Sequence, residues 1–220
     1  MYNIENIKSI HLEVTSKCQA KCPMCPRRMQ GGILMPWIDL TEITIDQFKE
    51  WFPINFIKQL NKLNMCGNLG DPIIAKDTVL IYKYLRENNA TMDLQMHTNG
   101  SARDNQFWKN LAALNVKVVF GIDGLEDTHS KYRIGTDFNK IIENAKTFIN
   151  AGGEARWDML VFQHNQHQTD ECEKLANDLG FVFFQKKNSS RFKDGKYNVL
   201  NESGKTIDIL YPTKKSKSFV

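Results

Sequence analysis

Cys18, Cys22 and Cys25 stand in the spacing C-x3-C-x2-C, directly after the alternating apolar run 10–14. A loop at a strand end with this spacing carries three thiolates, which are ligands of zinc and of iron–sulfur clusters. Three sulfurs leave one position of a zinc ion or of a four-iron cluster without a protein ligand. Because reactive metal centres keep such an open position and structural sites are closed, the spacing predicts a metal site that performs chemistry.

The remaining cysteines fit a reducing compartment. The 220 residues contain five cysteines, an odd number with three close together, which favours metal ligation over a disulfide framework. Cys66 and Cys172 lie in apolar patterns and are interpreted as small buried hydrophobic residues. The first residues lack the pattern of a secretory signal, and no stretch approaches the ~18 apolar residues of a membrane span. The sequence therefore predicts a cytoplasmic protein that does not enter a membrane.

The net charge of +4 is mild, and much of it comes from the C-terminal stretch, with lysines at 205, 214, 215 and 217. A basic tail of this kind is typical of a solvated chain end. Nucleic acid is therefore not expected as a partner.

The elements that position the cysteines alternate between two patterns. Short apolar runs occupy 9–15, 62–67, 92–97, 116–122, 155–162 and 181–185, and segments with apolar residues at three- and four-residue spacing lie between them. This alternation predicts an α/β fold with six strands in a parallel sheet. Thr44 opens a helix with a capping box, Pro53 predicts a kink or split in it, and Thr136 is the expected cap of the helix before Gly152. The pattern after residue 190 predicts a β-hairpin over 197–210.

Polar or glycine-rich residues follow each of the first four strands. The strand ends read Gly70-Asp71-Pro72, Thr98-Asn99-Gly100 and Gly121-Ile122-Asp123-Gly124, in addition to the cysteines. One such loop is an ordinary turn. Four in succession at the carboxyl ends of parallel strands, where βα folds place their functional atoms, predict one shared site.

These four elements together resemble the radical S-adenosylmethionine (SAM) superfamily, with Asp71 where that family most often has glutamate in its Gly-Glu-Pro motif. The resemblance covers about residues 7–190. It implies a partial (β/α)6 TIM-like barrel, a [4Fe–4S] cluster held by Cys18, Cys22 and Cys25, and SAM on the fourth iron. It also implies reductive cleavage of SAM to a 5′-deoxyadenosyl radical that abstracts a hydrogen atom from a substrate carbon.

The resemblance also assigns SAM contacts, residue by residue. The expected contacts are Met24, Gly70, Asp71, Thr98, Asn99, Asp123 and Gln163. At Gly70 and Asp71 we expect backbone contacts more than side-chain contacts, since aspartate reaches one methylene less far than glutamate. Gly121 replaces the serine common at its position, so Gln163 or His164 is expected to supply one hydrogen bond to SAM.

The segment from Cys22 to Arg27 is similar to the branch whose members often carry a SPASM or twitch domain with auxiliary clusters. No cysteine follows Cys172 here. We expect a barrel domain over 1–190 and a hairpin extension with a basic tail over 191–220, the extension covering the open bottom or side of the barrel. A minimal single-cluster enzyme is favoured over the N-terminal part of a longer one.

Three functions remain open. The first is a radical SAM enzyme that acts on a peptide or protein, with a low-potential electron donor such as flavodoxin or ferredoxin. The second is a radical SAM enzyme that acts on a small molecule or nucleotide. The third is a non-catalytic module in which the three cysteines and a histidine such as His11 bind zinc or an electron-transfer cluster.

Overall fold

A computed structural model describes residues 3–192 and 194–214. Its strands are β1 (Ser9–Leu12), β2 (Lys62–Met65), β3 (Asp93–Thr98), β4 (Val116–Gly121), β5 (Ala155–Val161), β6 (Phe183–Asn188), β7 (Tyr197–Leu200) and β8 (Thr206–Leu210). Its α-helices are α1 (Ile45–Trp51), α2 (Ile54–Gln59), α3 (Thr78–Asn88), α4 (Asn105–Ala113), α5 (Glu126–Tyr132), α6 (Phe138–Asn150) and α7 (Thr169–Leu179), with 3-10 turns η1 (Ile4–Asn6) and η2 (Gln166–Gln168). The end of the expected basic tail, 215–220, lies outside the described residues.

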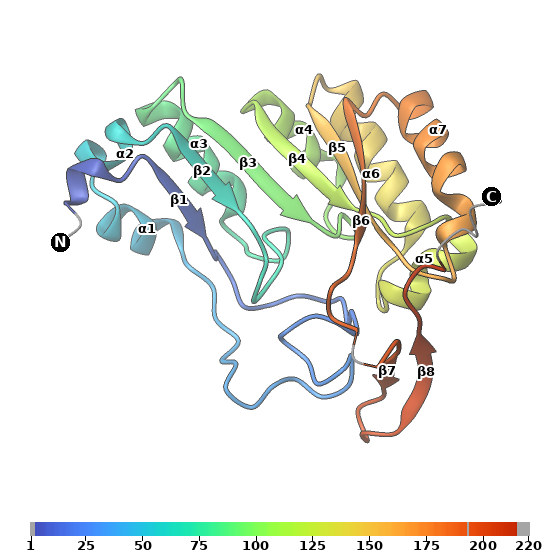
Figure 1. Cartoon of the computed structure of the whole chain (residues 1–220). Coiled ribbons are helices and arrows are strands. Elements are labelled where there is room, and N and C mark those ends of the chain that lie inside the picture. The colour runs from blue at the N-terminus through green and yellow to red at the C-terminus, as the bar shows by residue number, and fades with distance from the viewer. Residues whose placement is uncertain (1–2, 193, 215–220) are drawn as a thin grey trace.

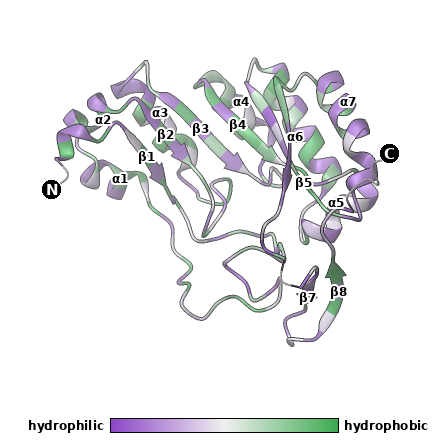
Figure 2. Ribbon diagram, viewed as in Figure 1, coloured by the Kyte–Doolittle hydropathy of each residue, from purple (hydrophilic) through white to green (hydrophobic). Residues whose placement is uncertain are grey.

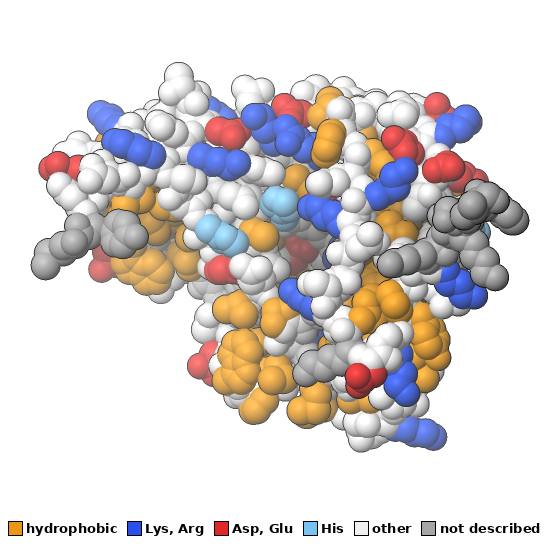
Figure 3. All heavy atoms as spheres, in the orientation of Figure 1, with side chains coloured by type: hydrophobic (Ala, Val, Ile, Leu, Met, Phe, Trp, Pro, Cys, Tyr) orange, Lys and Arg blue, Asp and Glu red, His pale blue; other side chains and the backbone are white. Residues whose placement is uncertain are grey.

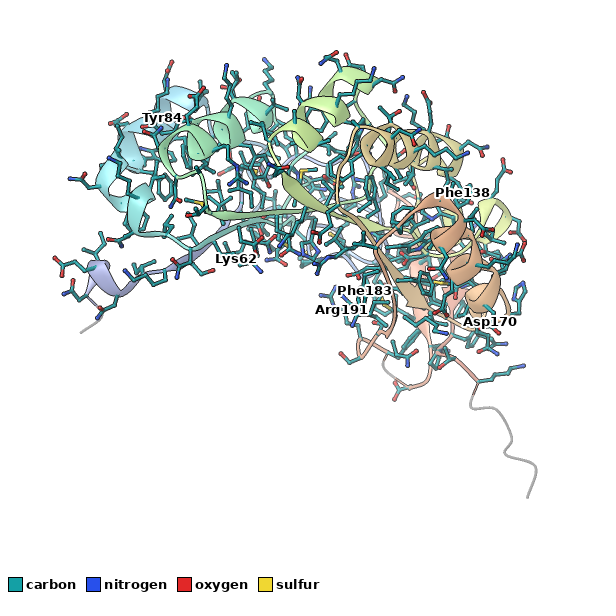
Figure 4. The ribbon with its side chains drawn as sticks, turned by 90° about the horizontal axis from the view of Figure 1, so that it is seen from above. Lys62, Tyr84, Phe138, Asp170, Phe183 and Arg191 are labelled. Carbon is teal, nitrogen blue, oxygen red and sulfur yellow. The ribbon has the colours of Figure 1, made fainter. Side chains whose placement is uncertain are left out.

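The six strands β1 to β6 form one parallel sheet in chain order, which confirms the predicted α/β partial barrel. The helices lie along the convex side of this curved sheet, as the view from above shows (Figure 4). Hydrophilic and hydrophobic segments alternate along the helices, as expected of elements with one buried face (Figure 2). The strands' carboxyl ends point toward the long loop after β1, residues 13–44, which we call the cysteine loop (Figure 1).

The local signals for helix ends have mixed outcomes. Thr44 caps α1 through a capping box with Gln47, and Pro53 separates α1 from α2, as predicted. Thr136 does not cap α6: the cap is Asp137, whose side chain accepts a hydrogen bond from the backbone N–H of Lys140. The Thr136 hydroxyl instead donates to the Arg133 carbonyl, three residues earlier, at 2.7 Å, so a local side-chain-to-backbone bond competes with its capping propensity.

Two separate apolar clusters hold the molecule together. The large one fills the space between sheet and helices and includes the buried Trp108, Phe120 and Trp157. The small one lies below the sheet and joins the cysteine loop to the β7–β8 hairpin through residues such as Met24 and Leu210. The hairpin was expected to cover the open bottom or side of the barrel. Its Val199 and Leu210 pack on the cysteine loop and also on Tyr132 of α5 and Phe162 after β5. The assignment of 191–220 as a separate extension stays a prediction.

Cys172 is buried in the large cluster, as expected, whereas Cys66 is only half-buried at the end of β2. Among the described residues, no helix is both long and apolar enough to cross a membrane.

Candidate active site

The three cysteines of the cysteine loop line one cavity of about 240 Å³ beneath the ends of the strands. Cys22 is buried, and Cys18 and Cys25 are half-buried. Burial raises the pKa of Cys18 to about 12 and that of Cys22 to about 11. Thiols in such surroundings lose their protons when a metal takes the place of the proton, so these sulfurs are suited to metal ligation.

Arg27 lines the same cavity and makes it suitable for an anionic group. Its side chain is buried, and Nε and Nη2 donate to the Ser16 carbonyl at 3.1 and 2.6 Å. Its Nη1 is buried without a hydrogen-bond partner. A buried N–H group without an acceptor costs about 1–3 kcal/mol, and a negatively charged iron–sulfur cluster supplies sulfur acceptors and charge beside it. The residues present therefore fit an iron–sulfur cluster.

The zinc alternative finds less support. It needs a fourth protein ligand, and His11 is not among the residues that line the cysteine cavity. His11, the proposed fourth ligand, has its Nε2 3.2 Å from Glu13 Oε1 and 3.3 Å from the Cys66 carbonyl.

The end of β2 packs directly against the cysteine loop. A Cβ atom on Gly70 would lie 1.9 Å from the Thr15 carbonyl oxygen, so only glycine fits there. The next residue, Asp71, donates its backbone N–H to the Lys17 carbonyl at 2.9 Å. The Gly-Asp pair therefore fixes the chain that leads into Cys18.

The Asp71 carboxylate turns toward the end of β3. It is buried and accepts hydrogen bonds from Thr98 Oγ1 at 2.8 Å, from Asn99 N at 2.8 Å and Nδ2 at 2.6 Å, and from Ile73 N at 3.2 Å. Burial raises the pKa of Asp71, and the bonds from Asn99 and Thr98 oppose that rise. These bonds position Asn99, whose Nδ2 also lies 3.7 Å from Cys18 Sγ.

Asp123, at the end of β4, is paired with Arg133 after α5. Arg133 Nε donates to Asp123 Oδ2 at 2.5 Å, and Leu160 N donates to Oδ1 at 2.6 Å, so both carboxylate oxygens are engaged. Burial raises the pKa of Asp123, and the positive charge of Arg133 opposes that rise. For Arg133, burial alone would lower the pKa, but the charge of Asp123 raises it above its ordinary value. Arg133 Nη1 lies 3.9 Å from Cys22 Sγ.

The same arginine fills the space beside Gly121. A Cβ atom there would lie 2.4 Å from Arg133 Nη2. The glycine found where the family commonly has serine thus makes room for a guanidinium.

A larger cavity of about 440 Å³ adjoins the cysteine cavity and shares Gly70, Asp71, Asn99 and Arg133 with it. We call the two together the inner cleft. Its far wall carries charges that the sequence reasoning did not assign to the site: Asp158 on β5, Lys187 on β6 at 2.5 Å from it, and Arg191. Arg191 lies on the concave side of the sheet (Figure 4). The available signal was the charge at 158 inside an otherwise mostly apolar strand.

The structure brings together four of the seven expected SAM contacts and places three elsewhere. Gly70, Asp71, Thr98 and Asn99 line the inner cleft. Asp123 is fully buried against Arg133 and Leu160 N and lines neither cavity. Met24 lies behind the cysteines in the small apolar cluster, and its carbonyl accepts a hydrogen bond from Arg191. Gln163 donates its backbone N–H to the Tyr211 carbonyl beyond β8, at 3.0 Å. The assignments of all these residues to SAM stay predictions.

Residues 12–179 match the sequence model of the radical SAM superfamily, so the chain belongs to that family and is an enzyme of the radical SAM class. Its cofactors are the family's [4Fe–4S] cluster and SAM.

Solved structures have the same fold. SuiB of Streptococcus suis bound to S-adenosylmethionine has a TM-score of 0.68 at 16% identity, over 86% of this chain and 42% of SuiB. The structure of anSMEcpe with bound AdoMet has a TM-score of 0.65 at 19% identity, over 83% of this chain and 49% of anSMEcpe. Methylornithine synthase (PylB) has a TM-score of 0.61 at 12% identity, over 83% of this chain and 53% of PylB. The chain thus spans about half the length of these proteins.

Proposed function

We propose that this enzyme holds its [4Fe–4S] cluster on Cys18, Cys22 and Cys25 and uses SAM to abstract a hydrogen atom from a peptide or protein substrate. The single observation that carries the proposal is the shared cavity of the three cysteines, whose neighbouring walls are the loops after β2 and β3 and the end of α5 with Arg133. When bound, the cluster and SAM supply a 5′-deoxyadenosyl radical, and the protein supplies binding, orientation and exclusion of water.

The chain's own residues perform that positioning in two networks. Asp71 fixes Asn99 and Thr98 at the cleft wall through buried hydrogen bonds. Asp123 holds Arg133 against the cysteine loop. Both carboxylates are buried acceptors with fixed partners, so they orient donors and need not move during the reaction.

Two observations support a peptide substrate. β6 is at the end of the sheet order, four of its six residues are exposed, and its Lys187 lines the cleft. An edge strand of this kind offers backbone groups to which an extended peptide can pair. Among the similar structures, one is described as SuiB bound to precursor peptide SuiA and another as anSMEcpe with bound AdoMet and Cp18Cys peptide.

A small polar molecule is the second candidate, and the Asp158–Lys187 pair on the cleft wall favours it. Opposite charges at the wall of a cleft of about 440 Å³ fit a compact substrate that carries both signs. In either case the enzyme needs a low-potential one-electron donor, for which we propose a flavodoxin or ferredoxin.

The test is anaerobic reconstitution with iron and sulfide, reduction with dithionite, and chromatographic measurement of 5′-deoxyadenosine. Cys22→Ala should abolish the product, whereas the matched control Cys172→Ala, in the helix layer, should keep it. If Cys22→Ala forms 5′-deoxyadenosine at the parent rate, the cluster assignment is wrong.

The substrate class is tested with fractions of a cell extract. A peptide substrate predicts that the protein fraction accelerates 5′-deoxyadenosine formation and that prior protease digestion to single amino acids removes this effect. Acceleration by the small-molecule filtrate alone would establish the second candidate.

A further inference from the structure

The cysteine loop has a second, outward-facing hollow, which is separate from the inner cleft. This outer groove, about 490 Å³ in volume, is lined by Met24, Cys25, Arg28, Met29, Met35 and Arg191, among others. Cys25, Pro26 and Arg191 line both the groove and the cysteine cavity, so they form the wall between them. A molecule in the outer groove therefore approaches Cys25 without entering the inner cleft.

The groove has a fixed shape, because the turn between Arg28 and Leu34 is hydrogen-bonded to the β7–β8 hairpin. Arg28 and Leu34 pair across the turn, and Arg28 Nη1 donates to the Gly32 carbonyl at 2.5 Å. The Gln30 carbonyl accepts from Leu200 N on β7 at 2.9 Å. The shape of the groove thus follows from contacts inside the described chain.

The lining is apolar and positive. It contains two arginines, Arg28 and Arg191, and no carboxylate. In the neighbouring hollow, which shares Gln30 with the groove, Asp194 and Lys196 carry opposite charges. Glu202, whose carboxylate also interacts with Arg28, is paired with Lys21 at 2.6 Å. These opposite charges balance, so the two arginines leave the groove positive.

Exposed apolar side chains extend the groove outward. Met29 is 47% exposed, and Ile33, Trp37 and Leu40 are also exposed on the same loop. Hydrophobic side chains gather over this part of the molecule, below the sheet (Figure 3). Exposed apolar groups gathered beside a positive hollow are typical of a surface that binds a protein partner.

We propose that the outer groove is the docking surface of a small acidic one-electron carrier, an inference that rests on the function proposed above. Three features select this partner: the groove reaches a cluster ligand from outside, its charge is complementary to an acidic surface, and its flexible methionines suit a transient encounter. One electron passes from the carrier, whose flavin hydroquinone becomes the semiquinone, to the iron–sulfur centre behind Cys25. The substrate keeps the inner cleft, so both partners can be bound together.

The test changes the charge of the groove at Gln30, which lines it without lining the inner cleft. Gln30→Glu adds a negative charge with almost no change of shape, and Gln30→Lys adds a positive one. A second pair compares Met29→Glu with Leu80→Glu, the same kind of substitution at a 48% exposed position on α3. The probe is an acidic flavodoxin with the reconstituted protein.

Two measurements are made on each variant. Titration calorimetry with oxidised flavodoxin gives the affinity without any turnover. Stopped-flow absorbance gives the rate of cluster reduction by flavodoxin hydroquinone and, separately, by dithionite. At ~0.01 M ionic strength, where charges act over ~30 Å, Gln30→Glu and Met29→Glu should weaken binding and slow flavodoxin-driven reduction about tenfold, and Gln30→Lys should speed it.

The reduction by dithionite should stay at the parent rate in all four variants, and Leu80→Glu should match the parent in both assays. At ~1 M salt the difference between Gln30→Glu and Gln30→Lys should nearly vanish. Equal flavodoxin affinities for Gln30→Glu, Gln30→Lys and Met29→Glu would overturn the docking surface, while dithionite-driven formation of 5′-deoxyadenosine would still support the proposed function. A parent dimer that Met29→Glu converts to monomer, with flavodoxin affinity unaltered, would assign the groove to a second copy and overturn the proposal as well.

Discussion

Replacement of Asp71 by asparagine tests whether this carboxylate positions the SAM site. The two oxygens accept four hydrogen bonds, from Thr98, from the backbone and side chain of Asn99, and from Ile73. In asparagine one oxygen becomes an NH2 group, which faces at least one N–H donor in either orientation. One buried donor without an acceptor costs about 1–3 kcal/mol.

The unpaired donor belongs to Asn99 when the NH2 group takes the Oδ2 position and to Ile73 when it takes the Oδ1 position. Either orientation weakens the network that positions Asn99, so we expect weaker SAM binding. If about 2 kcal/mol is lost from the bound conformation, the Kd for SAM rises roughly 30-fold, at 1.4 kcal/mol per tenfold change. The assay is equilibrium dialysis of SAM against the reconstituted protein, with iron content and urea unfolding measured on the same samples. Iron content should equal that of the parent, because the cysteines are in another loop.

Asp93→Asn is the matched control, since Asp93 begins β3, the strand that ends at the Asp71 partner Thr98. It forms exposed ion pairs with Lys62 and Lys117, which contribute about 0–1 kcal/mol, so its SAM affinity should be unchanged. Equal Kd values for Asp71→Asn and Asp93→Asn would refute the reasoning, and so would loss of iron from Asp71→Asn.

Three further predictions concern glycine, charge and pH. Gly70→Ala places a Cβ atom 1.9 Å from the Thr15 carbonyl oxygen and should lower the free energy of unfolding by about 3 kcal/mol or more in urea titrations. Its control is Gly204→Ala, where the Cβ atom meets no neighbour but the residue has φ 77°, and this variant should lose about 1–2 kcal/mol. Arg133→Met leaves Asp123 buried without its partner and should cost about 3–5 kcal/mol; adding Asp123→Asn should recover part of this, and additive costs in the double-mutant cycle would contradict the pairing. Burial, and to a smaller extent Arg133, lowers the pKa of His129 to about 3, below the 6.5 of the unfolded chain. The folded state therefore keeps this histidine neutral while the unfolded chain takes up a proton, so the free energy of unfolding falls as the pH falls below 6.5. The parent should therefore lose about 2.3 kcal/mol relative to His129→Gln between pH 6.5 and 4.5, and parallel pH profiles of urea unfolding would refute this.

The alternation of apolar runs and helical segments was sufficient to predict the sheet, because β2 to β5 each carry buried apolar residues on the face that packs into the large cluster, even where the other face is polar. It was insufficient for β6, predicted over 181–185 and found at Phe183–Asn188. Phe181 packs into the core against Trp157 before the strand begins. The strand then continues through Lys186 and Lys187, whose ion pairs lie at the sheet edge where hydropathy gives no signal.

The candidate site was predictable as a set of loops but not as a set of contacts. Parallel topology alone brings Asp71, Asn99 and Asp123 to one rim. Whether a carboxylate faces a ligand or a neighbouring strand depends on packing. Asp123 meets Arg133 across one short helix, and Asp71 meets β3 at 27 and 28 residues' separation, so neither partner can be derived from local sequence.

The two separate apolar clusters bear on how the enzyme withstands air. The residues around the metal site belong to the small cluster and to backbone contacts within the cysteine loop, while the sheet and helices are packed by the large one. Oxidative loss of iron therefore should strip colour and turnover from the protein while its scaffold persists. Such bleached molecules should regain their cofactor from fresh iron and sulfide without a cycle of denaturation and refolding.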